Sequence, residues 1–262
     1  HPDVTNASRR IKSSEVERCA KNGVKEIVEV KVGYDGIVLG NAKTSNQLEL
    51  TKKQIFLALA KEVPGADGKM IPNPYQKWSD IDSSLPNTKI EVLGPPPTSG
   101  TRDAFVELVM REGCKEMDFY KDQDKKFIKA NCSRMRQDGP FIEAGENDNL
   151  IVQKLEANPN AFGIFGFSFL DQNSDKIQGS KVGDVDPTFE NIADGKYGVS
   201  RSLFFYVKKA HIGVVPGLKE YAQFFVADEL AGPDGPLATY GLVSDPALAD
   251  TQAAVASENT MN

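Results

Sequence analysis

The segment between Lys89 and Arg111 constrains the fold most, because it has the pattern of a strand, a tight loop and a helix in direct succession. Its first residues form a short strand-like apolar segment, the loop after them is rich in proline and glycine, and apolar residues then recur at helical spacing. Other strand-like and helix-like segments alternate along the rest of the chain. This alternation predicts an α/β fold.

Among the other strands that are predicted, three are relevant here. Two of them, Val24–Val32 and Ile37–Leu39, are expected to be separated by a turn at Asp35-Gly36. The third is Leu203–Lys208. All three contain the β-branched or aromatic residues that are enriched in strands.

Helix signals and the single tryptophan locate other parts of the core. Thr51 and Gln54 form a capping box, which indicates the start of a helix. Trp78 lies in a Pro/Gly-rich stretch and is interpreted as a core anchor beneath a loop. A helix is predicted at Pro216–Leu230, with its aromatic side chains facing inward. From Ser244 onward the chain lacks Lys and Arg and is predicted to be a frayed tail.

Composition excludes several functions. The 262 residues include 31 Lys and Arg against 37 Asp and Glu, a formal net charge of -6. This balance argues against binding of nucleic acid through bulk charge. No apolar run approaches the roughly 18–20 residues that cross a bilayer. His1 and His211 are the only histidines, so a His-ligated metal site or a Ser-His-Asp triad lacks side chains.

The loop Gly94–Arg102 contains the residues with the clearest chemistry. A helix that begins there exposes the unpaired N–H groups of its first turn at the positive end of its dipole. Ser99 and Thr101 add hydroxyl donors, and Gly100 lets a ligand approach the backbone. Arg102 supplies a positive charge. These features predict a cradle for a sulfate- or phosphate-sized anion. The alternative is an ordinary helix N-cap at Ser99.

Several segments have sequences typical of one family, and they occur in the family's order. The most specific is Ser99-Gly100-Thr101 followed by Arg102-Asp103-Ala104-Phe105. The others are Asn6-Ala7-Ser8, Tyr34–Leu39, Leu50–Phe56 with the later Trp78, Gly145–Asn149, Gly163–Phe167 and Leu203–Lys208. Together they resemble the periplasmic phosphate-binding proteins of ABC transporters, the PstS family, from His1 to about Leu242.

The resemblance implies an α/β fold of the type II periplasmic binding proteins, with two lobes joined by hinge strands and the ligand in the cleft between them. The first lobe is expected at residues 1–45 and 206–262, and the second at residues 46–205. The implied function is high-affinity binding of inorganic phosphate and its delivery to the permease, without chemistry on the ligand. Ser99, Gly100 and Thr101 are expected to donate from the second lobe and Ser8 from the first. No cofactor or metal is implied.

Three departures from the family pattern concern this ligand. The chain begins after a segment that supplies further donors in the family, which suggests a fragment. The family often has an aspartate after the position of Ser8, where this chain has Arg9. The family's usual arginine four residues before Ser99 is replaced by Pro95. We expect Arg9 and Arg102 to restore the lost positive charge.

Discrimination against sulfate then needs another acceptor for the proton that phosphate carries. Asp103, Glu146 and Asp148 are the candidates, and capping or surface roles for these acids are the alternative. For Arg9 and its neighbour Arg10, the alternative is a solvated basic pair.

The three cysteines support the interpretation of the chain as a fragment of a protein from an oxidising compartment. Cys114 and Cys132 lie 18 residues apart and flank a helical excursion, which predicts a disulfide. Cys19 is then left over, which suggests a partner outside this chain. Three buried reduced thiols are the alternative.

Other functions stay open from the sequence. They are binding of another tetrahedral oxyanion, a surface adhesion or sensor role without transport, and hydrolysis of a phosphate ester by Ser99. Ser99 has no evident base, because His211 is expected to be a capping or surface residue. The resemblance further implies a monomer in the periplasm, or lipid-anchored at the cell surface.

Overall fold

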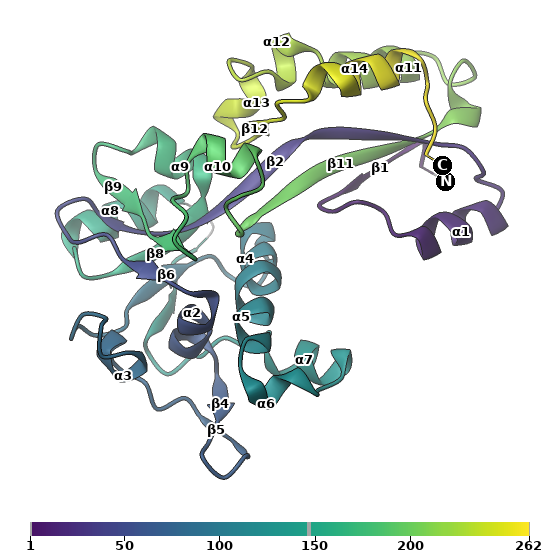
Figure 1. Ribbon diagram of the computed structural model, residues 1–262. Coiled ribbons are helices and arrows are strands. Elements are labelled where there is room, and N and C mark those ends of the chain that lie inside the picture. The colour runs from purple at the N-terminus through teal and green to yellow at the C-terminus, as the bar shows by residue number, and fades with distance from the viewer. Residues whose placement is uncertain (1, 146–147, 262) are drawn as a thin grey trace. The chain divides into compact units, whose positions relative to one another are not determined.

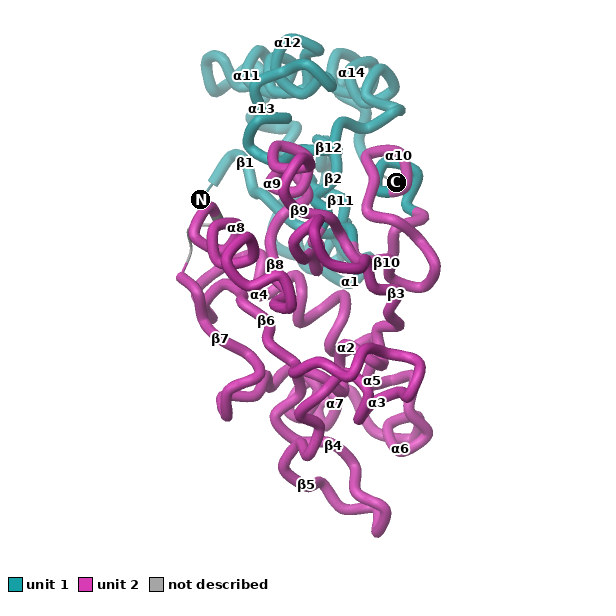
Figure 2. The backbone as a smooth tube through the Cα atoms, turned by 90° about the vertical axis from the view of Figure 1, so that its left-hand side faces the viewer, with its two compact units in different colours: residues 1–36, 192–195, 200–262 teal, residues 37–191, 196–199 magenta. Residues whose placement is uncertain are grey.

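The computed structural model describes residues 2–145 and 148–261, which divide into two compact units (Figure 2). The first unit comprises His1–Gly36, Ile192–Gly195 and Ser200–Asn262, coloured teal. The second comprises Ile37–Asn191 and Lys196–Val199, coloured magenta.

The first unit is an antiparallel sheet with helices. Its strands are β1 (Val4–Ala7), the first part of β2 (Ile27–Ala42), β11 (Ser200–Lys208) and β12 (Val243–Ser244). Its helices are α1 (Ser13–Lys21), the 3-10 turn η2 (Lys209–His211), α11 (Leu218–Phe225), α12 (Asp228–Ala231), α13 (Pro236–Thr239) and α14 (Leu248–Ala256). In this sheet β1 pairs with β11, and β2 pairs with both β11 and β12.

Helices α11, α12 and α14 lie along one face of β2 and β11 (Figure 1). Alternate residues of the two strands point toward this layer, since a strand presents successive side chains to opposite faces. The resulting apolar cluster contains Val28, Val30, Val32, Phe205, Val207, Leu218, Ala222, Val226, Ala231, Leu248 and Val255.

The predicted frayed tail after Ser244 is wrong, because this segment forms α14. Alanine-rich sequence has high helix propensity, and Leu248 and Val255 are 5% and 3% exposed within the apolar cluster. The inward orientation expected for the aromatic residues of α11 is also wrong for Tyr221 and Phe224, which are 48% and 62% exposed.

The predicted turn at Asp35-Gly36 is wrong as well, because β2 runs through it without interruption. Both residues pair with β11, with Asp35 opposite Arg201 and Gly36 opposite Ser200. The Asp35 carboxylate also accepts from the Arg201 guanidinium at 3.1 Å. An Asp-Gly pair predicts a turn only when its backbone groups lack a neighbouring strand, and here β11 supplies one.

The second unit combines a mixed sheet with most of the helices. Its further strands are β3 (Glu49–Leu50), β4 (Glu62–Pro64), β5 (Met70–Pro72), β6 (Val92–Gly94), β7 (Phe141–Glu143), β8 (Phe162–Gly166), β9 (Ile177–Gly179) and β10 (Lys181–Val182). Its helices are α2 (Lys52–Leu59), α3 (Trp78–Ile81), α4 (Gly100–Phe105), the π-helical stretch η1 (Val106–Met110), α5 (Arg111–Lys115), α6 (Asp118–Lys121), α7 (Lys125–Asn131), α8 (Asp148–Ala157), α9 (Phe167–Gln172) and the first part of α10 (Phe189–Ala193).

The strand order in the main sheet of this unit places β6 between two parallel neighbours, β7 and β8. The last part of β2 pairs antiparallel with β8 and β9. Two small sheets join β3 to β10 and β4 to β5. The parallel β6–β7–β8 core is the part that matters for the site, because the chain leaves β6 at Gly94 and enters α4.

Two predictions about the core of this unit are confirmed. Trp78 is fully buried, and its ring meets the ring of Phe162 edge-on at a centroid distance of 5.3 Å. At the start of α2, the Thr51 hydroxyl accepts from the Gln54 N–H at 3.1 Å. The Gln54 side chain accepts in turn from the Thr51 N–H at 2.8 Å. The capping box is therefore complete.

Candidate functional site

The start of α4 has the geometry that the sequence predicts for a helix N-terminus. Ser99 is the N-cap residue, and its hydroxyl oxygen accepts from the Thr101 N–H at 3.2 Å. Helical conformation continues from Gly100 through η1 and α5 to Lys115, so the dipole is that of one long helical run. The expected N-cap role of Ser99 and the expected helix start are both confirmed.

The first turn of α4 keeps donors available. The N–H groups of Gly100 and Arg102 have no acceptor among the described residues, as is usual for a helix start. A Cβ placed at Gly100 would meet nothing within 4 Å, so the backbone is open on that side. The Ser99 and Thr101 side chains are half-buried beside it. An anion at this position could accept from backbone and hydroxyl groups together.

Arg102 is the unusual residue of this turn, because its side chain is buried, with 9% exposed. One guanidinium nitrogen donates to the Pro95 carbonyl at 3.0 Å, and the guanidinium carbon lies 4.5 Å from the ring centroid of Phe141. Burial lowers the pKa of Arg102, while the charges of Glu143 and Asp103 raise it. None of the described carboxylate side chains forms an ion pair with this guanidinium.

A buried charge without an ion-paired opposite charge destabilises a fold, and a bound ion of opposite charge offsets this cost. Arginine stays protonated in proteins, so the charge persists in spite of burial. The combination of free backbone donors and a buried cation without an ion-paired carboxylate among the described residues therefore favours an anionic ligand at the start of α4.

The structure describes only some of the acids proposed to accept the proton of phosphate. Asp103 is exposed in the first turn of α4. Glu146 lies outside the described residues. Asp148 is the first residue of α8, and its side chain is also outside the description.

The predicted ligand residues of the first unit lie in the loop after β1. Ser8 and Arg9 are exposed. The Arg9 guanidinium donates to the two carboxylate oxygens of Glu15 at 2.8 and 3.0 Å. Arg9, together with the Lys12 N–H, lowers the pKa of Glu15 to about 2. The charge of Arg9 is thus balanced by a carboxylate, in contrast to that of Arg102.

Arg10 is balanced in the same way. Its Nε donates to both carboxylate oxygens of Glu29 at 2.9 and 3.0 Å, and its side chain is 67% exposed.

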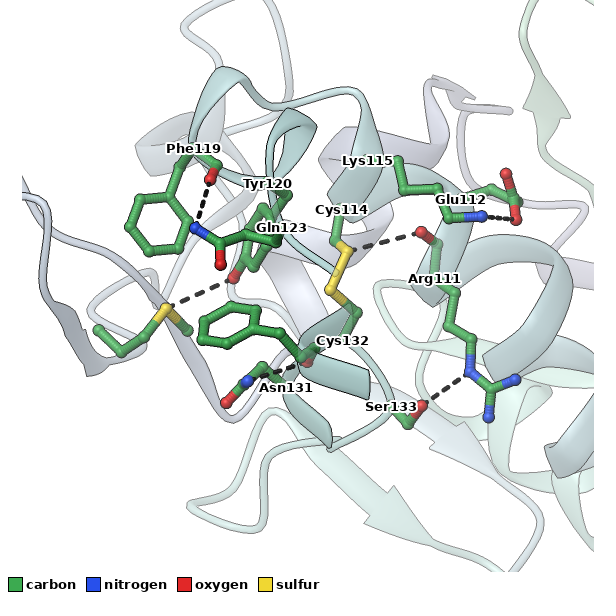
Figure 3. Close-up of a disulfide and its surroundings, with 12 residues drawn as sticks. Arg111, Glu112, Cys114, Lys115, Phe119, Tyr120, Gln123, Asn131, Cys132 and Ser133 are labelled. Atoms are coloured by element: carbon green, nitrogen blue, oxygen red, sulfur yellow. Dashed lines mark hydrogen bonds and ion pairs between the residues drawn. A yellow bond between two sulfur atoms is a disulfide. The ribbon is translucent and has the colours of Figure 1, made fainter. Parts of the chain in front are cut away.

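The predicted disulfide between Cys114 and Cys132 is present (Figure 3). Both residues are fully buried. The bond joins the end of the helical run that begins at Gly100 to the end of α7, and the enclosed segment contains α6 and α7. Cys19 is a free, half-buried thiol against the cluster of Ile27, Phe204 and Tyr206.

The contacts of Ser99 and His211 do not support the alternative of a hydrolase that uses Ser99 as its nucleophile. The Ser99 oxygen accepts the Thr101 N–H. His211, expected to be a capping or surface residue, has its Nδ1 at 2.5 Å from the Asp3 carboxylate. The described part of the chain contains no group of three His, Cys, Asp or Glu residues that could hold a metal ion.

The sequence did not predict the contacts of Arg102 with Pro95 and Phe141. The departure from the family at Pro95 concerns its side chain, whereas the contact with Arg102 uses its carbonyl oxygen. Phe141 lies in β7, which is adjacent to β6 in the sheet but 47 positions further along the chain than Gly94. No local pattern could have indicated this neighbour.

The fold is the α/β fold of the type II periplasmic binding proteins. The chain belongs to the PBP superfamily, since residues 1–229 match the model of the PBP superfamily domain. The resemblance to the PstS family is confirmed by its relatives.

Among curated relatives, the chain is 31% identical over 233 residues to the phosphate-binding protein PstS of Staphylococcus haemolyticus (strain JCSC1435), which covers 87% of this chain and 62% of that protein. It is 30% identical over 233 residues to the phosphate-binding protein PstS of Staphylococcus saprophyticus subsp. saprophyticus, with 87% and 61% covered. The chain therefore spans about three fifths of the length of these relatives.

Solved structures show the same fold. A crystal structure described as that of a possible phosphate binding protein from Planctomyces limnophilus DSM 3776 matches with a TM-score of 0.73 and 24% identity, covering 98% of this chain and 80% of that one. PstS from Borrelia burgdorferi matches with a TM-score of 0.58 and 17% identity, covering 86% and 73%. In the described part of this chain, none of the helices has the length and apolar character needed to cross a bilayer.

Proposed function

We propose that this chain binds inorganic phosphate and delivers it to the permease of an ABC transporter, without chemical change to the ligand. The observation that supports this most is the buried Arg102 guanidinium, which lacks a described carboxylate partner beside the free amides of α4. A tetrahedral oxyanion supplies the missing negative charge and several acceptor oxygens. The curated relatives are named as phosphate-binding proteins, which fits this ligand.

Each group has a role in the proposed complex. The Gly100 N–H donates to one ligand oxygen, and the hydroxyls of Ser99 and Thr101 donate to others. Because the Ser99 oxygen already accepts the Thr101 N–H, its own proton stays available for donation. Arg102 contributes the charge.

The two units are proposed to act as the two lobes, with Ser8 and Arg9 contributing from the first lobe on closure. We propose that the chain acts as a monomer outside the cytoplasm, either in the periplasm or attached to the cell surface by a lipid. It acts as a carrier, with Ser99 as a hydrogen-bond donor and not as a nucleophile.

Calorimetric titration with phosphate and with sulfate tests the proposal, using a matched pair of arginine variants. Arg102→Met removes the buried charge, and Arg10→Met removes an exposed charge that is balanced by Glu29. Loss of a buried charged donor costs about 2 kcal/mol or more of binding energy, so the dissociation constant should rise about 30-fold or more in Arg102→Met. Arg10→Met should bind phosphate like the unchanged protein.

Other outcomes would contradict the proposal in different ways. Equal loss in both variants would mean that only the overall charge matters. Tighter binding of sulfate than of phosphate would favour another oxyanion as the ligand. Release of phosphate from an aryl phosphate ester, abolished in Ser99→Ala, would favour the hydrolase.

A further inference from the structure

Arg102 is held in a different way from the other well-buried arginine of the second unit. Arg136 is 1% exposed, and its guanidinium pairs with the Asp138 carboxylate at 2.6 and 2.7 Å and with three backbone carbonyls. Arg102 instead has an aromatic ring on one side and a single carbonyl, that of Pro95. Arg136 is therefore neutralised by a directly paired carboxylate, whereas Arg102 has no such ion pair among the described residues.

The ring beneath Arg102 is itself fixed by the sheet. Phe141 begins β7 and is 5% exposed. In the neighbouring strand, a Cβ placed at Gly94 would lie 2.7 Å from Cε2 and 3.0 Å from Cζ of this ring. The ring thus occupies the space that a side chain at position 94 would take. Gly94 allows the close approach that brings the face of Phe141 under the guanidinium.

These two contacts restrict different motions of the guanidinium. The attraction of the cation to the negative face of the ring holds the guanidinium carbon over the ring. The bond to the Pro95 carbonyl restricts rotation of the group, and it uses one of the five N–H groups of arginine. Neither contact brings a negative charge, so neither of them competes with an anion for the remaining N–H groups.

We propose that Phe141 is a positioning residue for the ligand, which orients the Arg102 guanidinium toward the anion and makes room for it through Gly94. This proposal rests on the proposed binding of phosphate. A carboxylate in place of the ring would hold Arg102 as well, but it would compete with the anion for the same charge. The ring avoids this competition.

The test compares phosphate dissociation constants of ring variants by calorimetry. Phe141→Leu keeps an apolar side chain and removes the ring face, and we expect about 3- to 30-fold weaker binding. Phe141→Tyr keeps the ring and should bind nearly as well as the unchanged protein. Phe162→Leu is the matched control, because Phe162 is a similarly buried ring of the same sheet that packs on Trp78. It should lower the melting temperature without a change in phosphate affinity.

A double-mutant cycle separates positioning from a general structural effect. In the background of Arg102→Met, Phe141→Leu should cause no further loss of phosphate affinity, because there is no guanidinium left to orient. The same loss in both backgrounds would overturn the proposal. If Phe141→Leu does not fold, Gly94→Ala provides the second variant, since its methyl group displaces the ring and should weaken binding in the same direction.

The outcomes for the two proposals are distinct. If the unchanged protein binds no phosphate, the proposed function fails and the role of Phe141 fails with it. If the unchanged protein binds phosphate and Phe141→Leu binds it equally well, only the role of Phe141 is refuted.

Discussion

Removal of the disulfide should destabilise the second unit by an amount that follows from the loop it closes. Cys114 and Cys132 are separated by 18 residues, and both are fully buried. In the chain-entropy model, closing a loop of this length removes about 11 cal/mol/K of entropy from the unfolded chain, or about 3 kcal/mol at 25 °C. The double variant Cys114→Ala/Cys132→Ala should lose about that much unfolding free energy.

The single tryptophan makes the assay specific to this unit. Trp78 is the only tryptophan of the chain, is fully buried and belongs to the second unit, as the disulfide does. Its fluorescence during urea unfolding therefore reports on the relevant part of the molecule. The unchanged protein in a thiol reductant should unfold like the double variant, and the double variant should not respond to the reductant.

Either of two results would refute this reasoning. A loss below about 1 kcal/mol in the double variant would mean that the bond does not restrict the unfolded chain as the loop length requires. A further destabilisation of the double variant by reductant would show that another thiol reaction was being measured, with Cys19 as the remaining thiol.

Three further predictions concern stability. Gly113→Ala should lower the free energy of unfolding in urea by more than about 1 kcal/mol, because the added Cβ would lie 2.1 Å from the Lys52 carbonyl oxygen. An unchanged unfolding midpoint would show that α2 and α5 can separate freely. Thr51→Ala should cost about 1 kcal/mol through loss of the cap of α2, and a neutral result would mean that another group replaces it. The pKa of Glu15 is lowered from 4.5 to about 2 in the folded chain by Arg9, so this pair stabilises the fold above about pH 4.5 and the contribution is lost as the pH falls toward about 2. The melting temperatures of the unchanged protein and Glu15→Gln should therefore converge on acidification, and a constant difference would contradict the assignment.

Much of the fold could be predicted because its signals are local. The capping box at Thr51 uses residues three apart, and the burial of Trp78 follows from its size and apolar ring. Two of the wrong predictions depended on distant partners. Asp35-Gly36 stays extended because β11 pairs with it, and the segment after Ser244 becomes helical because the apolar cluster of the first unit covers it.

The candidate site, like the fold, was predictable where its signals are local. Ser99 as an N-cap and Gly100 as an open backbone position follow from the local sequence. The environment of Arg102 does not, since the ring beneath it comes from another strand. The ion pairs of the arginines were also not predictable, because Arg9 pairs with a carboxylate six residues away and Arg102 forms no ion pair with the described side chains.

The most direct test of the proposed function is binding of radiolabelled inorganic phosphate to the 262-residue chain in equilibrium dialysis. The account predicts saturable retention of the label, displacement by unlabelled phosphate, weaker displacement by sulfate at matched ionic strength, and a strong loss of retention in Arg102→Met. Absence of saturable retention by the unchanged chain, or retention that is the same in Arg102→Met, would contradict it.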